Sequence, residues 1–230
     1  MYLQRGYYNG YGTMRQDISY MRLLYASPDA WASSRQSLRP APDAMAVDVY
    51  ANSSLIASGL SYKGFTEYLQ VIPGIYNLKV FPVGTTGMAL LDTQIEIPVQ
   101  SIVTTAIIGV SPNMGAKAFF EPVLQIPAGK LYLRFANLVP DGPDMDLVLS
   151  DGTTLFEDVS YGAAASYIAV FPKLYTFYLQ QAGTDRSLLY VPNIQLMPDR
   201  FYTIYAVGQV KGNTPLQVLV PLDGNSYIKL

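Results

Sequence analysis

Six aspartates near proline-rich turns are the residues whose type and spacing come nearest to a metal site. Three lie in the first half of the chain and three in the second: Asp29, Asp43, Asp48, Asp141, Asp144 and Asp146. Calcium takes about six to eight oxygen ligands, and clustered loop aspartates can supply several of them. However, the spacing does not fit an EF-hand loop, and aspartates beside proline also form Asx-turns. We therefore expect structural turns and no metal, with calcium as the alternative.

The chain offers little for catalysis. It has no histidine and no cysteine, which removes Ser-His-Asp, Cys-His and thiolate–zinc chemistry. A glycoside hydrolase needs two carboxyl groups held across a cleft, but the glutamates are scattered, and neither Glu67 nor Glu96 is acidic at the matching position of the second half. Phosphate-binding glycine loops are absent too. We predict a protein that is not an enzyme and has no cofactor.

Charge and hydropathy argue against nucleic acid as a partner and against a membrane span. A net charge of −2 and a pI near 5.1 give no electrostatic reason to bind nucleic acid. No apolar run approaches the roughly 18 residues of a membrane span. Arg5, Asn9 and Asp17 interrupt any signal-peptide pattern in the first twenty residues. We expect cytoplasmic synthesis, followed by action there or by arrival at a surface along another route, unless a signal has been removed.

The sequence that positions these residues repeats itself. Between Ser61 and Pro122, one ungapped shift of 99 residues gives 13 identities in 62 positions. The clearest match pairs YLQVIPGIY, from Tyr68, with YIAVFPKLY, from Tyr167. A unit of about 100 residues has the size of a domain. We predict an arm at residues 1–20 and two modules, at 21–126 and 127–230, held close by a short linker.

Within each module the hydrophobic period is two. Tyr76, Leu78 and Val80 alternate with Asn77 and Lys79, and short runs of this kind are separated by turn residues such as glycine, proline and asparagine. No segment shows the helical spacing over three turns. This pattern predicts an all-β protein of two tandem, immunoglobulin-like, antiparallel β-sandwich modules.

The N-terminal arm has a composition of its own. Its tyrosines are interleaved with glycines: Tyr2, Tyr7, Tyr8, Tyr11 and Tyr20. Glycine frees the backbone, while tyrosine supplies adhesive, amphipathic surface. The arm is therefore either a solvated tail or a segment that docks on another subunit.

The first module also carries an insertion. Aligning Tyr25-Ala26 with Phe135-Ala136 leaves it about eleven residues longer than the second, in a stretch that contains Trp31, Arg35 and Arg39. A loop present in only one copy is a reasonable place for specialised contacts. A tolerated surface insertion explains it equally well.

The tyrosines shared by both copies suggest structural roles. Tyr62, Tyr68 and Tyr76 recur at the 99-residue shift. Exposed aromatic rings on a sheet can stack on sugars, but alternating positions fit core packing or a tyrosine corner better.

Three segments in order resemble a widespread bacterial module: LLYASPDA from Leu23, PDA from Pro42, and AVDVY from Ala46. This module is the family called domain of unknown function 4397, which has a histidine where this chain has Tyr25. The resemblance implies an extracytoplasmic or cell-surface β-sandwich with no established enzymatic activity, and it supplies no catalytic residues.

Two functions remain open. The first is a structural protein of a cell or spore surface, which associates with itself or with other envelope proteins through its arm, since strand edges and head-to-tail contacts can build a filament or lattice. The second is a monomeric adhesion or carbohydrate-binding module with a disordered arm.

Overall fold

We analysed a computed structural model, which describes residues 17–28 and 46–230. Most of the predicted arm and insertion contacts lie outside the described residues, as do two of the aspartates: Tyr2, Tyr7, Tyr8, Tyr11, Asp29, Trp31, Arg35, Arg39 and Asp43.

The first module consists of two four-stranded sheets. The inner sheet has the order β4-β1-β7-β8, with β4 at Leu69–Val71, β1 at Ser19–Tyr25, β7 at Ile102–Val110 and β8 at Asn113–Phe120. The outer sheet has the order β3-β2-β5-β6, with β3 at Ser54–Leu60, β2 at Val47–Ala51, β5 at Gly74–Pro82 and β6 at Leu91–Ile97.

The second module repeats this plan. Its inner sheet runs β12-β9-β16-β17, with β12 at Ala163–Ala164, β9 at Leu131–Asn137, β16 at Phe201–Val207 and β17 at Gln217–Leu219, and β13 at Ile168–Val170 also pairs with β9. Its outer sheet runs β11-β10-β14-β15, with β11 at Thr154–Val159, β10 at Met145–Leu149, β14 at Lys173–Gln181 and β15 at Ser187–Leu196. A short 3-10 helix, η1 at Gly224–Ser226, follows.

The predicted fold class is confirmed, with one addition: each inner sheet contains a parallel pair. β1 runs parallel to β7 and places Arg22 opposite Thr104, while β9 runs parallel to β16 and places Arg134 opposite Thr203. These registers make Arg22 the counterpart of Arg134, 112 residues away. The alignment of Tyr25 with Phe135 is therefore wrong by two residues, and the first module is longer by thirteen residues (112 minus 99) at this point.

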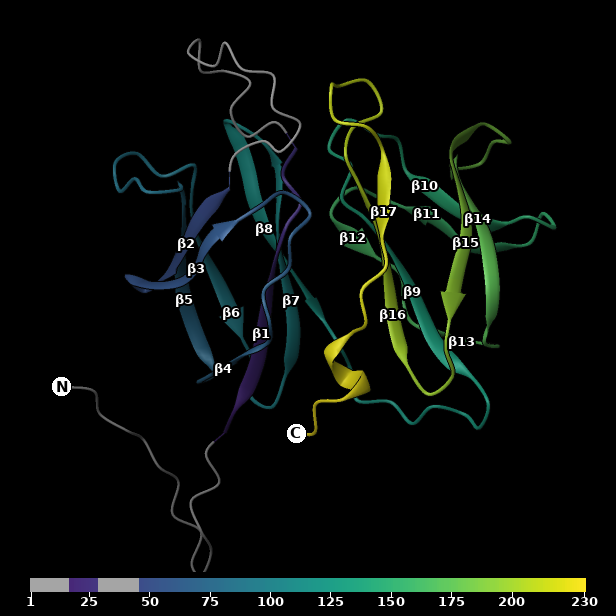
Figure 1. Ribbon diagram of the computed structural model, residues 1–230, viewed down its shortest axis with the longest axis horizontal. Helices are drawn as coiled ribbons and strands as arrows, with labels where there is room; N and C mark the ends of the chain where they lie inside the picture. The colour runs from purple at the N-terminus through teal and green to yellow at the C-terminus, as the bar shows by residue number, and fades with distance from the viewer. Residues whose placement is uncertain (1–16, 29–45) are drawn as a thin grey trace, which may run out of the picture.

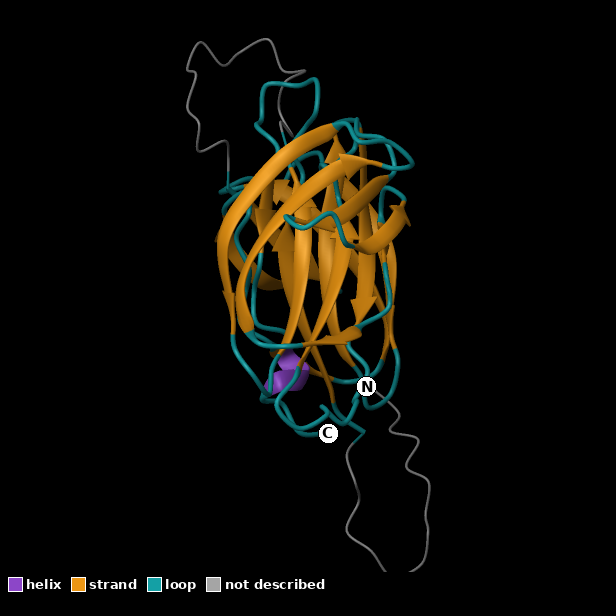
Figure 2. Ribbon diagram, turned by 90° about the vertical axis from the view of Figure 1, so that its right-hand side faces the viewer, coloured by secondary structure: helices purple, strands orange, loops and turns teal. Residues whose placement is uncertain are grey.

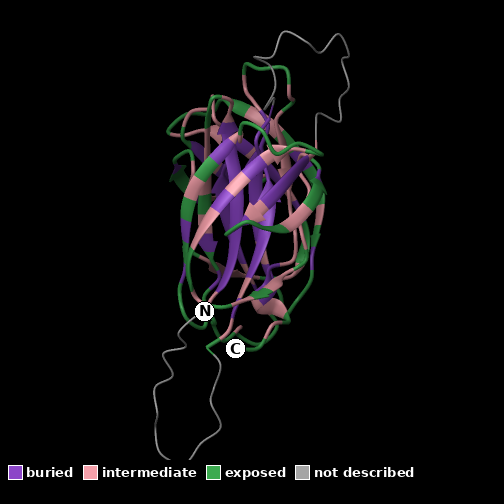
Figure 3. Cartoon of the chain, turned by 90° about the vertical axis from the view of Figure 1, so that its left-hand side faces the viewer, coloured by how far each residue is buried: buried purple, intermediate pink, exposed green. Residues whose placement is uncertain are grey.

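The four sheets stack as outer, inner, inner, outer (Figure 1). Position in the stack explains the sequence patterns. Outer strand β6 alternates buried Leu91, Ile95 and Ile97 with exposed polar residues, since one face meets water. Inner strand β7 is buried at nearly every position, because both of its faces are covered. Buried residues fill the inner strands, while exposed residues lie on the loops and in bands along the outer strands (Figure 3).

Apolar side chains fill all three spaces between the sheets. The core of the first module includes Leu23 and Leu78, and that of the second includes Phe135 and Phe177. A third cluster joins the modules. It combines Leu24, Ala26, Ala106, Ile108 and Phe119 from one side with Ala136, Leu138, Tyr205 and Val207 from the other. The two modules therefore pack face to face through a core of their own.

Candidate functional site at the module junction

The aspartates predicted to form turns serve as acceptors for backbone amides. Asp48 accepts hydrogen bonds from the N–H groups of Gly59 and Gly84, both at 2.9 Å. These bonds, that of Gly84 first, hold the pKa of Asp48 below its usual value. In the second module, Asp146 accepts from the N–H groups of Asp158 and Gly183 at 2.8 and 3.2 Å. Each aspartate therefore binds two backbone N–H groups, and these groups occupy equivalent positions in the two copies.

The other two described aspartates also take part in turns. Asp141 accepts from the N–H groups of Val210 and Lys211, both at 2.8 Å, and the backbone carbonyl of Asp144 accepts from Ala182 at 2.9 Å. Within residues 17–28 and 46–230, no three acidic side chains gather in a way that could hold a metal ion.

A buried polar network lies where the two modules meet, and sequence reasoning missed it. Its first centre is Arg22 on β1, whose side chain is 5% exposed. The Nε of Arg22 donates to Thr104 Oγ1 at 2.8 Å, Nη1 donates to the carbonyl of Leu222 at 2.8 Å, and Nη2 donates to Asp223 Oδ1 at 2.9 Å. The last two acceptors belong to the second module. Arg22 therefore ties the two modules together.

Asp223 follows β17 and is fully buried. Besides Arg22, it accepts hydrogen bonds at Oδ2 from Tyr167 at 2.8 Å and from Thr203 at 2.6 Å. Burial raises the pKa of Asp223 from 3.8 to about 6; repulsion by Glu121 adds to this rise, and Arg134 and Arg22 oppose it.

Glu121 is the acid of the first module in this network. It accepts at Oε1 from Tyr68 at 2.5 Å and from Thr104 at 2.8 Å, and at Oε2 from the N–H groups of Gly224 and Asn225 at 2.7 and 3.3 Å. Both oxygens of this buried carboxylate are therefore occupied. Burial, and then the Glu121 charge, raises the pKa of Tyr68, which keeps its hydroxyl a neutral donor.

The second arginine, Arg134 on β9, mirrors Arg22. Its Nε donates to Thr203 Oγ1 at 2.7 Å and its Nη1 donates to the carbonyl of Phe120, in the first module, at 2.7 Å. The guanidinium carbon lies 4.5 Å from the centre of the Tyr167 ring. Among the described residues, nothing accepts a hydrogen bond from Arg134 Nη2, although this atom is buried.

The network has an approximate twofold arrangement. In each module a threonine and a tyrosine donate to the acid of the same module, and an arginine reaches across to the other module. Tyr68 with Tyr167, and Thr104 with Thr203, were visible in the 99-residue repeat. Arg22 and Arg134 were not, because the alignment before residue 61 was wrong by two residues.

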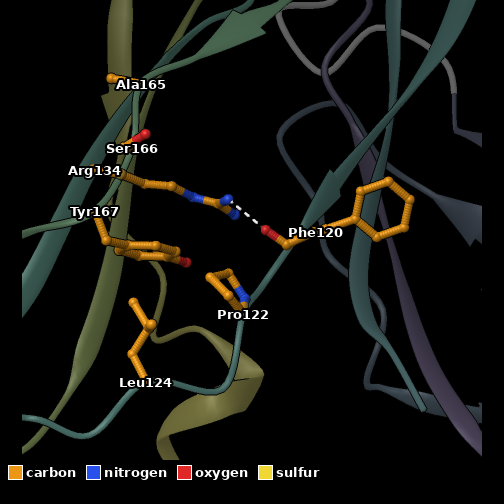
Figure 4. Close-up of a pocket in the computed structure, with 7 residues that line it drawn as sticks. All are labelled: Phe120, Pro122, Leu124, Arg134, Ala165, Ser166 and Tyr167. Carbon is orange, nitrogen blue, oxygen red and sulfur yellow. Dashed lines mark hydrogen bonds between the residues drawn. The ribbon is translucent and has the colours of Figure 1, made fainter.

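A cleft of about 370 Å³ opens beside Arg134. It is lined by Phe120, Pro122, Leu124, Arg134, Ala165, Ser166 and Tyr167. Figure 4 shows the Arg134 guanidinium between Tyr167 and the segment that carries Phe120 and Pro122. The cleft therefore lies between the modules, with a positive group at its inner end.

A second candidate surface lies at the end of the molecule where β1 begins. In both modules an apolar pair is exposed where the long outer strand begins, one residue in the turn before it and one in its first residues, and the loop after the next strand exposes a third residue. We call these residues the apolar end face: Ile72, Ile75, Val99, Phe171, Leu174 and Met197, which are between 53% and 77% exposed. The turns that carry them lie at the lower end of Figure 1, where η1 and the C-terminus also lie (Figure 2).

Of the predicted arm residues, only Tyr20 is described. It belongs to β1 and pairs with Gln70 and Ile102, so it is part of the sandwich and not of an arm. The neighbouring Ser19 donates from Oγ to the carbonyl of Pro98 at 2.6 Å and pairs with Val71. The chain before β1 therefore joins the fold beside the Ile72 and Val99 turns.

Two of the recurring tyrosines behave as tyrosine corners, as predicted. Tyr76 donates to the carbonyl of Ile72 at 2.5 Å and Tyr175 donates to that of Phe171 at 2.6 Å, each four residues upstream.

Comparison with known proteins gives a family and no function. A family model described as a domain of unknown function (DUF4397) matches residues 38–148 and 131–228. No curated protein sequence matches the chain. No helix among the described residues is long and apolar enough to cross a membrane.

Three solved structures show a distant likeness. The Bacillus anthracis TIE protein is 11% identical with a TM-score of 0.25; the alignment covers 84% of this chain but only 34% of that one. A family CBM26 module of Eubacterium rectale Amy13K, solved with maltoheptaose, is 10% identical with a TM-score of 0.26, over 88% of this chain and 98% of that one. A streptococcal virulence factor described as binding alpha-glucan is 12% identical with a TM-score of 0.26, over 92% and 99%. At such TM-scores we draw no argument from them.

Proposed function

The chain belongs to the DUF4397 family, and from that premise we propose that it is a non-enzymatic structural protein of a cell or spore surface. It associates with copies of itself, or with other envelope proteins, through its N-terminal arm. The acceptor for the arm is the apolar end face of a neighbouring copy.

The apolar end face carries this proposal. Ile72 and Phe171 occupy equivalent positions of the repeat, as do Ile75 and Leu174, and all four are more than half exposed. A single exposed apolar residue is ordinary, whereas several at one end of a rigid unit are typical of an interaction surface. Both copies present them at the same end because the modules pack face to face.

The position of the arm supports the same conclusion. Residues 1–16 precede β1 and carry four tyrosines among glycines. Fully extended, sixteen residues span at most about 55 Å, which is enough to reach another copy. Tyrosine is a residue of choice for such contacts, because its ring buries apolar area while its hydroxyl remains hydrogen-bonded.

The chemistry of the junction supports a structural role. The two acids there, Glu121 and Asp223, accept seven hydrogen bonds between them from the protein itself. Carboxylates engaged in this way hold modules together and are poorly placed to exchange protons with a substrate.

The test compares the native chain with two variants and a control. One variant replaces Tyr2, Tyr7, Tyr8 and Tyr11 by serine, and the other is Ile72→Asp with Phe171→Asp. The control, Met88→Asp, changes a side chain that is 91% exposed in the loop between β5 and β6. We expect light scattering and electron microscopy to show assemblies of the native chain and the control, and monomers of both variants. A native chain that stays monomeric at high concentration would refute the proposal.

The place in the envelope needs a separate measurement. Immunogold labelling of intact cells and spores is expected to decorate their surface, and labelling confined to the cytoplasm would contradict this part of the proposal.

A second candidate function, carbohydrate binding, has one observation in its favour. Tyr178 on β14 and Tyr190 on β15 form a cross-strand pair on the outer sheet, with ring centres 5.2 Å apart and Tyr190 55% exposed. Such a pair offers a platform on which sugar rings can stack. Tyr190→Ala is expected to abolish any signal on a glycan array, while Leu55→Ala, an exposed change on the other outer sheet, leaves it unchanged. An array without signal for the native chain removes this candidate.

A further inference from the structure

We propose that the cleft between the modules binds a small carboxylate with an apolar body, which accepts a hydrogen bond from Arg134 Nη2. This site is independent of the self-association proposed above.

The repeat itself indicates the missing group. Arg22 and Arg134 occupy equivalent positions, and each donates from Nε to a threonine of its own module and from Nη1 to a carbonyl of the other module. At Arg22 the third position, Nη2, binds the Asp223 carboxylate at 2.9 Å. At Arg134 that position has no acceptor among the described residues. A carboxylate oxygen placed there completes the symmetry.

The network cannot supply that oxygen. Glu121 is the acid that corresponds to Asp223, but Tyr68 and Thr104 occupy its Oε1 while η1 occupies its Oε2. The N–H group of Gly224, at 2.7 Å, draws Glu121 toward the C-terminal segment. A buried arginine donor without an acceptor is costly, and a charged acceptor forms the strongest hydrogen bond with it.

The residues that line the cleft indicate an apolar body for the part of the ligand beyond its carboxylate. Pro122 and Leu124 supply an apolar surface, and Tyr167 supplies an aromatic face beside Arg134. Phe120 contributes its backbone carbonyl, while its ring points away from the cleft. A volume of about 370 Å³ lies at the small end of the range of ligand pockets, about 300–1,000 Å³. This combination fits a branched or aromatic acid better than a sugar or an inorganic anion.

Access requires a small movement at the mouth. Arg134 is 4% exposed, and its Nη2 has almost no contact with solvent. Leu124 is 40% exposed and Ser166 is also exposed, so these two side chains can turn aside without uncovering the core. A ligand then replaces the apolar contacts that Leu124 loses.

The test uses 3-methylbutanoate as the probe and 3-methylbutanamide as its neutral control. Titration of the full chain is followed by amide chemical shifts in NMR spectra. We expect the acid to shift residues 120–124 and 165–167 in a saturable way, and the amide to do so at least tenfold more weakly. Leu124→Asp places a negative charge at the mouth and is expected to weaken binding of the acid at least tenfold. Leu55→Asp changes a leucine that is also exposed, at 50% against 40%, and is expected to leave binding unchanged.

Three results would overturn the proposal: no saturable shifts, equal binding of the acid and the amide, or full binding by Leu124→Asp. Because Leu124 and Leu55 are both exposed, both variants are expected to fold, which circular dichroism checks.

Discussion

Arg22 Nη2 and Asp223 Oδ1 are 2.9 Å apart, although 201 residues separate them in the chain. The arginine stands on β1 of the first module and the aspartate follows β17 of the second. This contact brings the C-terminal segment of the second module against the first module. The helix η1, directly after Asp223, packs there against Tyr68 and Glu121. The C-terminal segment therefore connects the two modules across the junction.

Removing one partner of this buried pair is expected to destabilise the whole protein. Arg22→Leu leaves Asp223 buried without its cation, and such losses cost about 3–5 kcal/mol. Chemical denaturation followed by tyrosine fluorescence measures the change. The matched control is the ion pair between Lys79 Nζ and Asp92 Oδ2, which are 3.1 Å apart. The side chains of this pair are 44% and 50% exposed. Lys79→Ala is expected to change the free energy of unfolding by less than about 1 kcal/mol, and similar losses in both variants would contradict this account.

Asp223 is expected to make stability depend on pH in the weakly acidic range. Its pKa is raised in the folded state to about 6 from 3.8, so the folded protein holds this proton more tightly than the unfolded chain. The stabilisation from that proton is complete below about pH 4 and is lost as the pH rises through 6.

We expect the free energy of unfolding of the native chain, relative to Asp223→Asn, to fall by roughly 1–3 kcal/mol between pH 4 and pH 7. Denaturation of both proteins at several pH values measures this difference. A difference that stays constant, or that grows with pH, would show that the arginines outweigh burial.

The repeat and the alternation of apolar residues were sufficient to predict the sandwiches, because both depend on local pattern. Gly109 and Gly208, which are identical at the 99-residue shift, illustrate this. Both have a positive φ, Gly109 within β7 and Gly208 directly after β16, and at both a Cβ would meet neighbouring backbone. The tyrosine corners were predictable for the same reason, since the hydroxyl bonds a carbonyl only four residues away.

The junction was not predictable, because its partners are distant in sequence. Glu121 reads as one scattered acid, and Asp223 as part of a turn, until the two modules are packed together. Arg22 and Arg134 lie outside the ungapped part of the repeat. The inner strand β7 carries a weaker signal, because its largely apolar stretch lacks the alternation of β6, and this is typical of burial on both faces. That signal shows that something covers the sheet, but not what covers it.

Gly208 is expected to tolerate no side chain. Its φ is 101°, and a Cβ built there would lie 2.3 Å from the carbonyl oxygen of Pro215. Gly208→Ala therefore combines backbone strain with a clash against main chain, and we expect a loss of at least about 1–3 kcal/mol. Gly115 in β8 is the control, since a Cβ there meets nothing within 4 Å. Thermal unfolding of Gly115→Ala is expected to match the native chain, and a tolerated Gly208→Ala would contradict the geometry.

Two tyrosines at the junction are expected to respond in opposite ways to loss of the hydroxyl. Tyr205 is fully buried in the apolar cluster between the modules, and its hydroxyl has no hydrogen-bond partner among the described residues. Tyr205→Phe removes a desolvated polar group and keeps the ring contact with Phe119, so it is expected to be neutral or stabilising.

Tyr68 carries the opposite expectation. Its hydroxyl donates to Glu121 at 2.5 Å and accepts from the N–H group of Gly224 at 3.0 Å. Tyr68→Phe leaves a buried carboxylate with one donor fewer, which costs about 1–3 kcal/mol. Measuring both variants by denaturation separates hydrogen bonding from ring packing, because each change removes one oxygen atom. If Tyr205→Phe is the more damaging change, the hydroxyl of Tyr205 has a partner in solution, and the junction is more hydrated than its apolar cluster implies.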